Sequence, residues 1–114
     1  MVVATSWAPE RGDLVWLRFH PQSGHEQAGR RPALVVSPRA YNEKVGLALF
    51  CPIASRAKEY PFEVALPAAG EVTGVVLTDQ IKSLDWRARK AERISGARGE
   101  VTKELLAKIS VLVS

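Results

Sequence analysis

The sequence predicts a mainly β protein of the α+β class, a small, partly open β-barrel that ends in an α-helix. Its 114 residues fit one domain, because a chain this short cannot form two hydrophobic cores. Five or six short apolar runs, separated by Gly, Pro and polar residues, are typical of strands. Only the C-terminal end has the periodicity of an amphipathic helix. We therefore expect residues 1–114 to form a single domain with a loose lead-in over residues 1–10.

The first half of the chain supplies three of the expected strands. Residues 14–19 (LVWLRF) are rich in β-branched and aromatic side chains, which suit a half-buried strand. A loop with two glycines and a proline follows at residues 20–31, and loops of this length are usually functional or disordered. The next strands are expected at residues 32–37 and 46–53, joined by a polar connection over residues 39–45. The strand at 46–53 (GLALFCPI) is expected to be buried on both faces.

The second half supplies shorter strands and the helix. Residues 61–66 (PFEVAL) alternate in the pattern of a half-buried strand, and residues 74–77 and 81–86 are two further apolar runs. Thr102 is the expected N-cap of the terminal helix. The apolar stripe of that helix consists of Leu105, Leu106, Ile109, Leu112 and Val113.

The composition argues against several classes of protein. No apolar run approaches the roughly 20 residues of a membrane span, and the N-terminus lacks the apolar core of a signal peptide. We therefore expect a cytoplasmic protein with no membrane partner. Cys51 is the only cysteine, so no intrachain disulfide can form, and its apolar neighbours favour a place in the core. One Cys and two His give no cluster with metal-ligand spacing, and no Gly-rich phosphate loop is present. We expect neither a metal nor a cofactor.

Positive charge is concentrated in residues 80–99. The formal net charge of the chain is +4. This segment alone has six Lys and Arg residues and two acidic residues, so its excess of positive charge (six minus two) equals the net charge of the whole chain. Clustered charge favours a polyanionic partner, although charge alone is equally compatible with a solvated loop. The six basic residues are Lys82, Arg87, Arg89, Lys90, Arg93 and Arg98.

A nuclease that works without metal is more plausible on RNA than on DNA. DNA hydrolysis requires an activated external water, which metal ions commonly supply. RNA carries its own nucleophile, the 2′-hydroxyl beside the scissile phosphorus. The protein then needs a base for that hydroxyl, a cation for the crowded negative charge and an acid for the leaving 5′-oxygen. The products would be a 2′,3′-cyclic phosphate and a 5′-hydroxyl.

The loop at residues 20–31 carries groups suited to this chemistry. His25 titrates near neutral pH and could act as base or acid, and Glu26 is a carboxylate next to it. Arg31 could bind a phosphate through two parallel hydrogen bonds. Phe19, at the mouth of the loop, could stack a base. From the residues alone, solvated or mutually paired side chains are the better interpretation of His25, Glu26 and Arg31, and packing at the barrel edge is the commoner role for an aromatic such as Phe19. For Trp86, which opens the basic segment, core packing is the better interpretation.

Together these residues resemble the MazF/PemK toxin family, which includes the Kid toxin. The resemblance runs from about Arg11 to the C-terminus. Its most specific stretches are RGDLVW (11–16), GHEQAGRRPALVVSP (24–38), KEYPFEV (58–64) and GVVLTDQIKSLDWRAR (74–89). It implies an SH3-like barrel, a homodimer and a sequence-specific, ribosome-independent endoribonuclease, an mRNA interferase that cuts single-stranded RNA. It also implies a cognate MazE-like antitoxin whose acidic tail covers the RNA groove, with operator DNA contacted only through that antitoxin.

The resemblance also assigns roles to single residues. The family's catalytic arginine falls on Arg31, and the lysine before the Tyr-Pro-Phe run falls on Lys58, which is expected to bind phosphate. In the MazF branch a threonine after the third strand helps hold the scissile phosphate. That position is Ala54 here, and we expect Ser55 beside it to supply the hydroxyl.

The Kid branch uses a different set, a histidine, an aspartate and an arginine. His25 and Asp79 match the first two, whereas Leu77 stands in the place of the arginine. The chain therefore matches neither site completely, and the choice between His25 and Glu26 as general base stays open. The residues expected to contact RNA besides Lys58 are Phe19, His20, Gln27, Asp79, Gln80, Lys82, Arg87 and Arg89.

Two other functions fit the sequence. The CcdB toxin resembles this fold but traps DNA gyrase and cuts no RNA, so a non-catalytic toxin with a protein target is one alternative. An inactive co-repressor that binds DNA with its antitoxin is the other. The Arg31 loop and Lys58 favour RNA cleavage, whereas Ala54 keeps both alternatives open.

Overall fold

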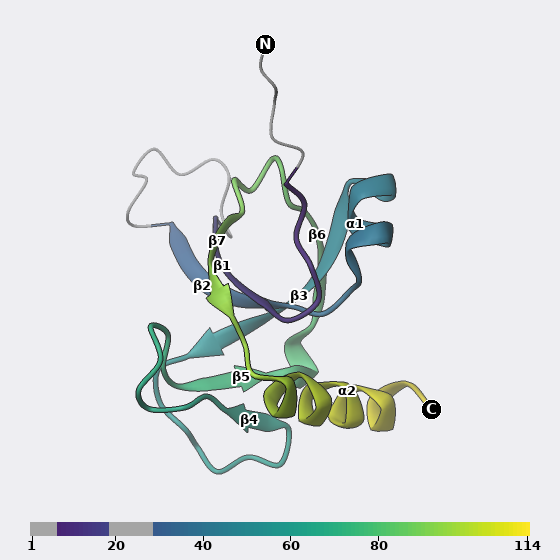
Figure 1. The fold of residues 1–114 in the computed structure, drawn as a ribbon. Coiled ribbons are helices and arrows are strands. Elements are labelled where there is room, and N and C mark those ends of the chain that lie inside the picture. The colour runs from purple at the N-terminus through teal and green to yellow at the C-terminus, as the bar shows by residue number, and fades with distance from the viewer. Residues whose placement is uncertain (1–6, 19–28) are drawn as a thin grey trace.

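Antiparallel strands and a C-terminal helix form the fold, which a computed structural model describes for residues 7–18 and 29–114 (Figure 1). Besides the strands there is a short helix, α1, and a single turn of 3₁₀ helix, η1. The elements in chain order are β1 (Asp13–Arg18), β2 (Arg30–Val35), α1 (Arg39–Val45), β3 (Leu47–Ala54), β4 (Glu63–Ala65), β5 (Val75–Leu77), η1 (Thr78–Gln80), β6 (Lys82–Asp85), β7 (Glu92–Gly96) and α2 (Gly99–Val113).

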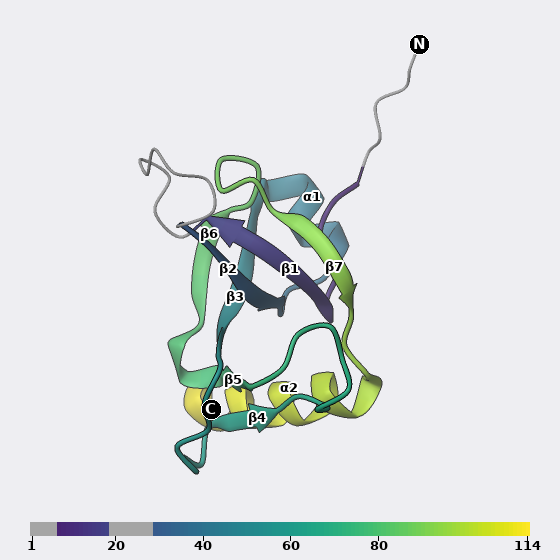
Figure 2. The same cartoon turned by 90° about the vertical axis from the view of Figure 1, so that its left-hand side faces the viewer.

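The strands pair in the order β4-β5-β3-β2-β1-β7, and β6 joins β3 outside this order. All the pairings are antiparallel. In Figures 1 and 2 the sheet curves around the core, and α2 lies under its lower part beside β4 and β5. Within the described residues, β4 and β7 end the order without pairing to each other. The expected partly open barrel with a C-terminal helix is thus confirmed.

Strand β3 is shared between the two parts of the barrel. Its first half pairs with β6 and its middle with β2, whereas Ile53 and Ala54 pair with Val76 and Val75 of β5. One buried cluster, which includes Phe50, lies above the point where β3 passes from one part of the barrel to the other. The other lies below it and is closed by α2, whose Leu105 is fully buried. Fully burying one such leucine contributes roughly 1.5–3 kcal/mol to folding.

A buried polar network attaches α1 to the barrel. The Asn42 Nδ2 group donates to the Pro9 carbonyl at 2.8 Å and to the Ser37 carbonyl at 2.9 Å. The Ser37 hydroxyl donates to Asn42 Oδ1 at 2.5 Å and accepts the Leu49 N–H at 2.9 Å. The Trp86 indole N–H donates to the Asn42 carbonyl at 2.9 Å. Asn42 therefore links three separate segments of the chain.

Several expectations about secondary structure were wrong. Residues 39–45, expected as an irregular polar connection, form α1, because its one buried side chain, Asn42, gives no apolar periodicity to detect. The basic segment contains β7, which pairs with β1. The terminal helix begins at Gly99 with Arg98 as N-cap, so Thr102 lies inside the helix. No helix within 7–18 and 29–114 is long and apolar enough to cross a membrane.

Expectations about the core were largely confirmed. Cys51 and Trp86 are both buried. Burial, and next the negative charge of Asp79, raises the pKa of the Cys51 thiol to about 12, so this side chain acts as a small apolar group. The expectation that the strand is buried on both faces was wrong: Leu47, its first residue, is exposed, and Leu49, Pro52 and Ile53 are only half-buried.

Replacing Asn42 with Ala is expected to lower the free energy of unfolding by about 2–3 kcal/mol, because buried donors and acceptors lose their partners. Urea unfolding followed by tryptophan fluorescence measures the change. The control is Glu43→Ala, an exposed position on the same helix, which is expected to stay within about 0.5 kcal/mol of the parent. Equal stabilities for the two variants would show that the network contributes little.

Candidate functional site

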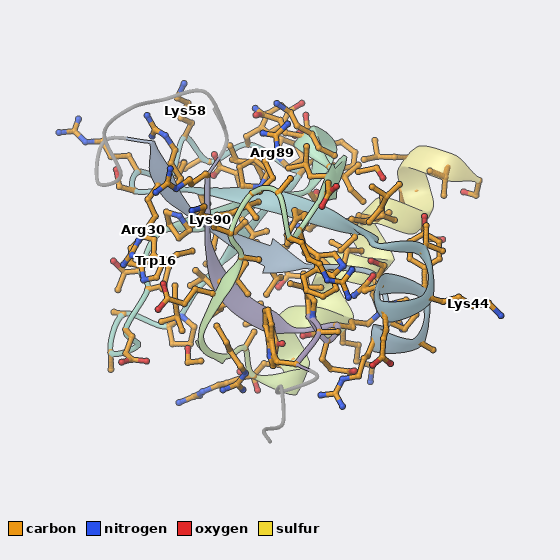
Figure 3. All side chains as sticks on the ribbon, turned by 90° about the horizontal axis from the view of Figure 1, so that it is seen from above. Trp16, Arg30, Lys44, Lys58, Arg89 and Lys90 are labelled. Atoms are coloured by element: carbon orange, nitrogen blue, oxygen red, sulfur yellow. The ribbon has the colours of Figure 1, made fainter. Side chains whose placement is uncertain are left out.

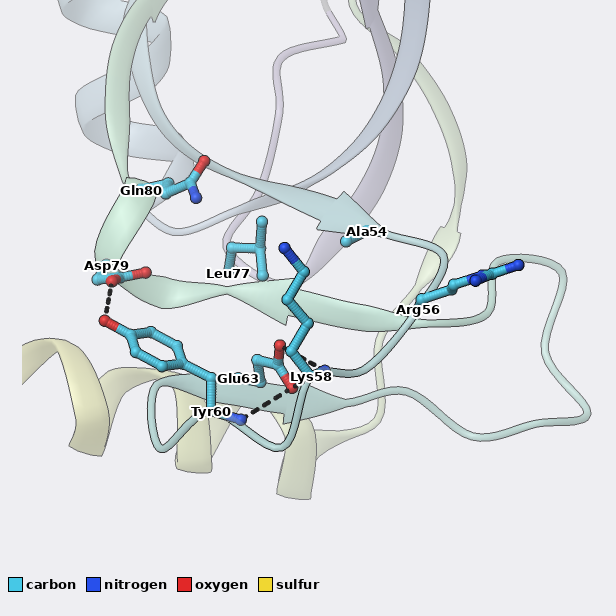
Figure 4. A pocket seen from close by; sticks show the side chains of 8 residues that line it. All are labelled: Ala54, Arg56, Lys58, Tyr60, Glu63, Leu77, Asp79 and Gln80. Atoms are coloured by element: carbon cyan, nitrogen blue, oxygen red, sulfur yellow. Dashed lines mark hydrogen bonds between the residues drawn. The ribbon is translucent and has the colours of Figure 1, made fainter.

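A pocket of about 380 Å³ lies where the end of β3 meets β5, η1 and the loop that leads to β4 (Figure 4). Its walls combine basic, acidic, amide and apolar side chains. The lining residues are Ala54, Arg56, Lys58, Tyr60, Glu63, Leu77, Asp79 and Gln80. The mixture of charged groups with the apolar side chains of Ala54 and Leu77 suits a charged ligand better than a purely apolar one.

A glycine allows the floor of this pocket to form. Gly74, just before β5, has a φ of +115°, and a Cβ built there would lie 2.0 Å from the Ala54 carbonyl oxygen. No side chain fits at that distance, so only glycine lets β5 pair closely with the end of β3. This pairing sets Ala54 and Leu77 in the same pocket wall.

The carboxylate of Glu63 holds the loop that carries Lys58. Its two oxygens lie 3.1 and 3.0 Å from the backbone nitrogen of Lys58, and Oε1 also accepts the Tyr60 N–H at 3.4 Å. Between them Glu59 has a φ of +57°, a conformation that is uncommon outside glycine. The Lys108 ammonium of α2 donates to the Glu63 carbonyl at 2.8 Å. Backbone and helix together fix the direction in which the loop side chains point.

Tyr60 and Asp79 close one side of the pocket. The Tyr60 hydroxyl donates to Asp79 Oδ2 at 2.7 Å, as the dashed line in Figure 4 marks. This hydrogen bond, and then the negative charge of Asp79, raises the pKa of Tyr60 above its ordinary value of 10.0. The raised pKa keeps the phenol protonated, and able to donate, to a more alkaline pH than an ordinary tyrosine.

Arg31 lies on β2, the strand that pairs with β3. Ala33 of β2 lies opposite Pro52 of β3 in an antiparallel pairing. Arg31 lies two residues before Ala33 on β2, opposite Leu17 of β1. Ala54 lies two residues after Pro52 on β3. Arg31 itself does not line the pocket. Arg31 is exposed, so its guanidinium is accessible to a ligand.

The structure gathers some of the residues expected at the site and not others. Lys58, Asp79 and Gln80 line the pocket together. Ala54, in the family's threonine position, also lines it, whereas Ser55 is exposed and does not line it. The remaining loop residues of the expected site, Phe19, His20, His25, Glu26 and Gln27, lie outside the described residues.

The basic segment does not converge on the pocket. Arg87 stacks on the ring of Trp86, with the guanidinium carbon 4.1 Å from the ring centre, and Arg89 donates to the Arg18 carbonyl at 3.4 Å. Lys82 lies on β6 opposite Phe50. In Figure 3, Lys58 and Arg89 both lie toward the side of the molecule away from Lys44. Lys82, Arg87 and Arg89 add positive charge to the protein surface, but unlike Lys58 they do not line the pocket.

Three lining residues were not singled out from the sequence: Arg56, Tyr60 and Glu63. Tyr60 and Glu63 belong to the KEYPFEV stretch. For Tyr60 the available signal was a tyrosine within a charged loop. Glu63 gave no signal, because its role depends on backbone groups brought near it by the fold.

The pocket lining holds two basic side chains, Arg56 and Lys58, and two carboxylates, Glu63 and Asp79. Its two carboxylates are engaged, that of Glu63 by backbone N–H groups and that of Asp79 by a phenol. In Figure 4 the ammonium end of Lys58 rises from the loop toward Leu77 and Ala54. With Arg56 in the lining and Arg31 exposed on the nearby strand β2, the arrangement suits a phosphate group and the charge that develops on it.

Comparison with known proteins gave consistent matches. The family described as PemK-like, MazF-like toxin of type II toxin–antitoxin system matches residues 10–113. The curated endoribonuclease toxin MazF of Escherichia coli K12 is 45% identical over 111 residues, which is 97% of this chain and 99% of that protein. A crystal structure of MazF from Deinococcus radiodurans superposes with a TM-score of 0.83 at 56% identity, covering 94% of this chain and 97% of that one. A MazE–MazF crystal structure from the same organism gives 0.83 at 50% identity, covering 94% and 96%.

The Tyr60 phenol is expected to titrate above pH 10.0, and replacing Asp79 with Asn should move its pKa back toward that value. Ultraviolet absorbance of tyrosinate measures this in a Tyr41→Phe background, where Tyr60 is the only tyrosine. Because folding raises the pKa, the hydrogen bond contributes its stability below pH 10 and loses it as the pH rises through the folded pKa. Unchanged titration in Asp79→Asn would contradict the assigned cause.

Proposed function

The chain belongs to the family of PemK-like, MazF-like toxins of type II toxin–antitoxin systems, and we propose that it cuts single-stranded RNA, at specific sequences and without ribosome or metal, in the pocket beside Arg31. The family and its curated relatives make the chain an endoribonuclease toxin. What the proposal adds is the mechanism and the residues that carry it.

The proposed step uses the nucleophile that RNA itself supplies. A base takes the proton of the 2′-hydroxyl, whose oxygen attacks the adjacent phosphorus. The bond from phosphorus to the 5′-oxygen breaks, and that oxygen receives a proton from a general acid. The products are a 2′,3′-cyclic phosphate and a 5′-hydroxyl, so atoms and charge balance without a water or a metal ion.

The cationic lining of the pocket carries this proposal. Arg31 stabilises the charge on the phosphate, and Lys58 binds one of its oxygens. The hydrogen bonds of Glu63 and Asp79 come from backbone N–H groups and from the Tyr60 phenol, not from the ammonium of Lys58, although both carboxylates keep their charge. Ser55 is proposed to reach the phosphate with its hydroxyl when RNA is bound, in place of the missing threonine at Ala54.

The proton transfers are assigned to the loop before β2. His25 or Glu26 acts as general base, and both remain proposals from the sequence because they lie outside the described residues. Phe19, His20 and Gln27 in the same loop are proposed to recognise bases that flank the cut. Gln80 lines the pocket itself and is proposed to bond to a base there.

Partners follow from the relatives. MazF of Deinococcus radiodurans is known in complex with MazE, and a MazE-like antitoxin is the partner of this chain. We propose that the antitoxin's acidic tail occupies the RNA site, that the toxin is a homodimer, and that it contacts operator DNA only through the antitoxin. We also propose that it acts in the cytoplasm, where mRNA is found.

Purified protein is expected to cut a long unstructured RNA in excess EDTA, at a short recurring sequence, leaving cyclic phosphate and 5′-hydroxyl ends. Arg31→Ala should lower the rate by about 100- to 1,000-fold. Arg39→Ala, which removes an exposed arginine paired with Glu10, is the matched control and should cut normally. Activity lost in EDTA would overturn metal independence. Toxicity that persists in Arg31→Ala would instead indicate a protein target such as gyrase.

Ser55→Ala is expected to lower the cleavage rate about 10- to 100-fold while leaving the thermal midpoint unchanged, since the side chain is exposed. Ala54→Thr is the companion variant, and it should restore activity when added to Ser55→Ala. Full activity in Ser55→Ala would show that no hydroxyl is needed at this position.

A further inference from the structure

Tyr60 is an exposed aromatic side chain that is nevertheless held in place. It is 46% exposed, although it lines the pocket. Its hydroxyl is fixed by Asp79 at 2.7 Å, and its ring contacts that of Phe62 with centres 6.0 Å apart and planes tilted by 55°. An aromatic ring on a loop normally gains stability by burial. Here the ring stays open to solvent and is oriented by contacts at its two ends.

The backbone under the ring is fixed as well. The Glu63 carboxylate accepts the Tyr60 N–H at 3.4 Å, and the Tyr60 carbonyl accepts the Glu63 N–H at 3.1 Å. Lys108 of α2 in turn holds the Glu63 carbonyl. The ring therefore loses little conformational freedom when a ligand binds, which favours binding.

The neighbours of the ring are those of a nucleotide site. Figure 4 shows Tyr60 along one side of the pocket, with Lys58 and Gln80 as further lining residues. Lys58 supplies a cation for a phosphate, and the Gln80 amide offers both a donor and an acceptor for the edge of a base. Unpaired RNA bases bind proteins by stacking on such aromatic rings.

We propose that the ring of Tyr60 is the platform on which one unpaired base of the RNA stacks, next to the phosphate bound by Arg31 and Lys58. This inference rests on the proposed function and adds a base-binding subsite to it. Asp79 is then a positioning residue, which orients the platform through the phenol hydroxyl. Gln80 bonds to the edge of the stacked base.

A purely structural role for Tyr60 makes a different prediction. If the side chain only connects the loop to η1, the hydroxyl is the essential group, and Phe is as damaging as Leu. If the ring is a stacking platform, Phe retains most of the binding and Leu loses it.

The test uses RNA oligonucleotides that contain the mapped cleavage sequence. Affinity is measured by fluorescence anisotropy on a 2′-O-methyl version, which cannot be cut, and kcat and KM on the natural RNA. Tyr60→Leu is expected to weaken binding and raise KM about 10- to 100-fold, and Tyr60→Phe by no more than about threefold. Tyr41→Leu, at the other exposed tyrosine, outside the pocket, is the control and should bind normally.

A second arm identifies the base. Abasic nucleotides are placed one at a time along the oligonucleotide. One position should weaken binding to the parent protein about 10- to 100-fold, and the same substitution should add nothing further in Tyr60→Leu. This loss of additivity is a result that a change in folding would not produce.

The outcomes separate the two proposals. Equal losses in the Phe and Leu variants, or no loss in either, would overturn the platform while RNA cleavage stands. If the parent protein cuts no RNA, the proposed function fails. Binding of a random-sequence 2′-O-methyl RNA then decides the platform, which is upheld if Tyr60→Leu binds more weakly than the parent and Tyr60→Phe, and rejected if all three bind alike.

Discussion

The structure depends on strand β3, which pairs with three other strands and passes from the upper part of the barrel to the lower. Each backbone N–H and C=O buried along it must find a partner, so its course fixes those of β2, β5 and β6. Its last residue, Ala54, accepts the close approach of Gly74 and begins one wall of the pocket. The same strand pairs with β2, the strand that carries Arg31. The pocket thus lies at the end of paired strands, and the pairing of β3 with β5 fixes the positions of the lining residues that these strands carry.

The acidic residues of the pocket organise it, and the basic ones are left for the ligand. Glu63 binds two backbone N–H groups of its own loop, and Asp79 accepts a phenol. Hydrogen bonds to a carboxylate are stronger than those between neutral groups, which suits them to hold an exposed loop in one conformation. The ammonium of Lys58 is directed into the space that results. Both carboxylates keep their negative charge, so the lining combines two cations with two anions.

The positive charges of residues 80–99 do not form a single binding surface in the folded protein. Residues 80–99 hold an excess of positive charge, but the fold gives several of them other contacts. Arg93 pairs with the buried Asp13 at 3.0 Å, and Arg87 packs over Trp86. Residues 92–96 of this segment form β7. A strand can carry exposed charged side chains while its backbone pairs with β1. The excess therefore adds to the long-range field around the protein and to barrel packing, more than to a single binding patch.

The sequence by itself determined the fold class, most strands, the burial of Cys51 and Trp86, and a share of the site that includes Lys58. The fold class, the strands and the buried residues follow from alternation, turn residues and side-chain chemistry, all of which are local, whereas Lys58 was identified through the resemblance to the toxin family. The tertiary structure alone decided α1 and β7, since one is held by Asn42 bonded to residues outside its helix and the other by pairing with a strand almost eighty residues earlier. It also decided the orientation of Tyr60, whose partner Asp79 lies nineteen residues away. Local patterns cannot specify such contacts, because hydrogen-bond partners distant in sequence are chosen only when the barrel closes around them.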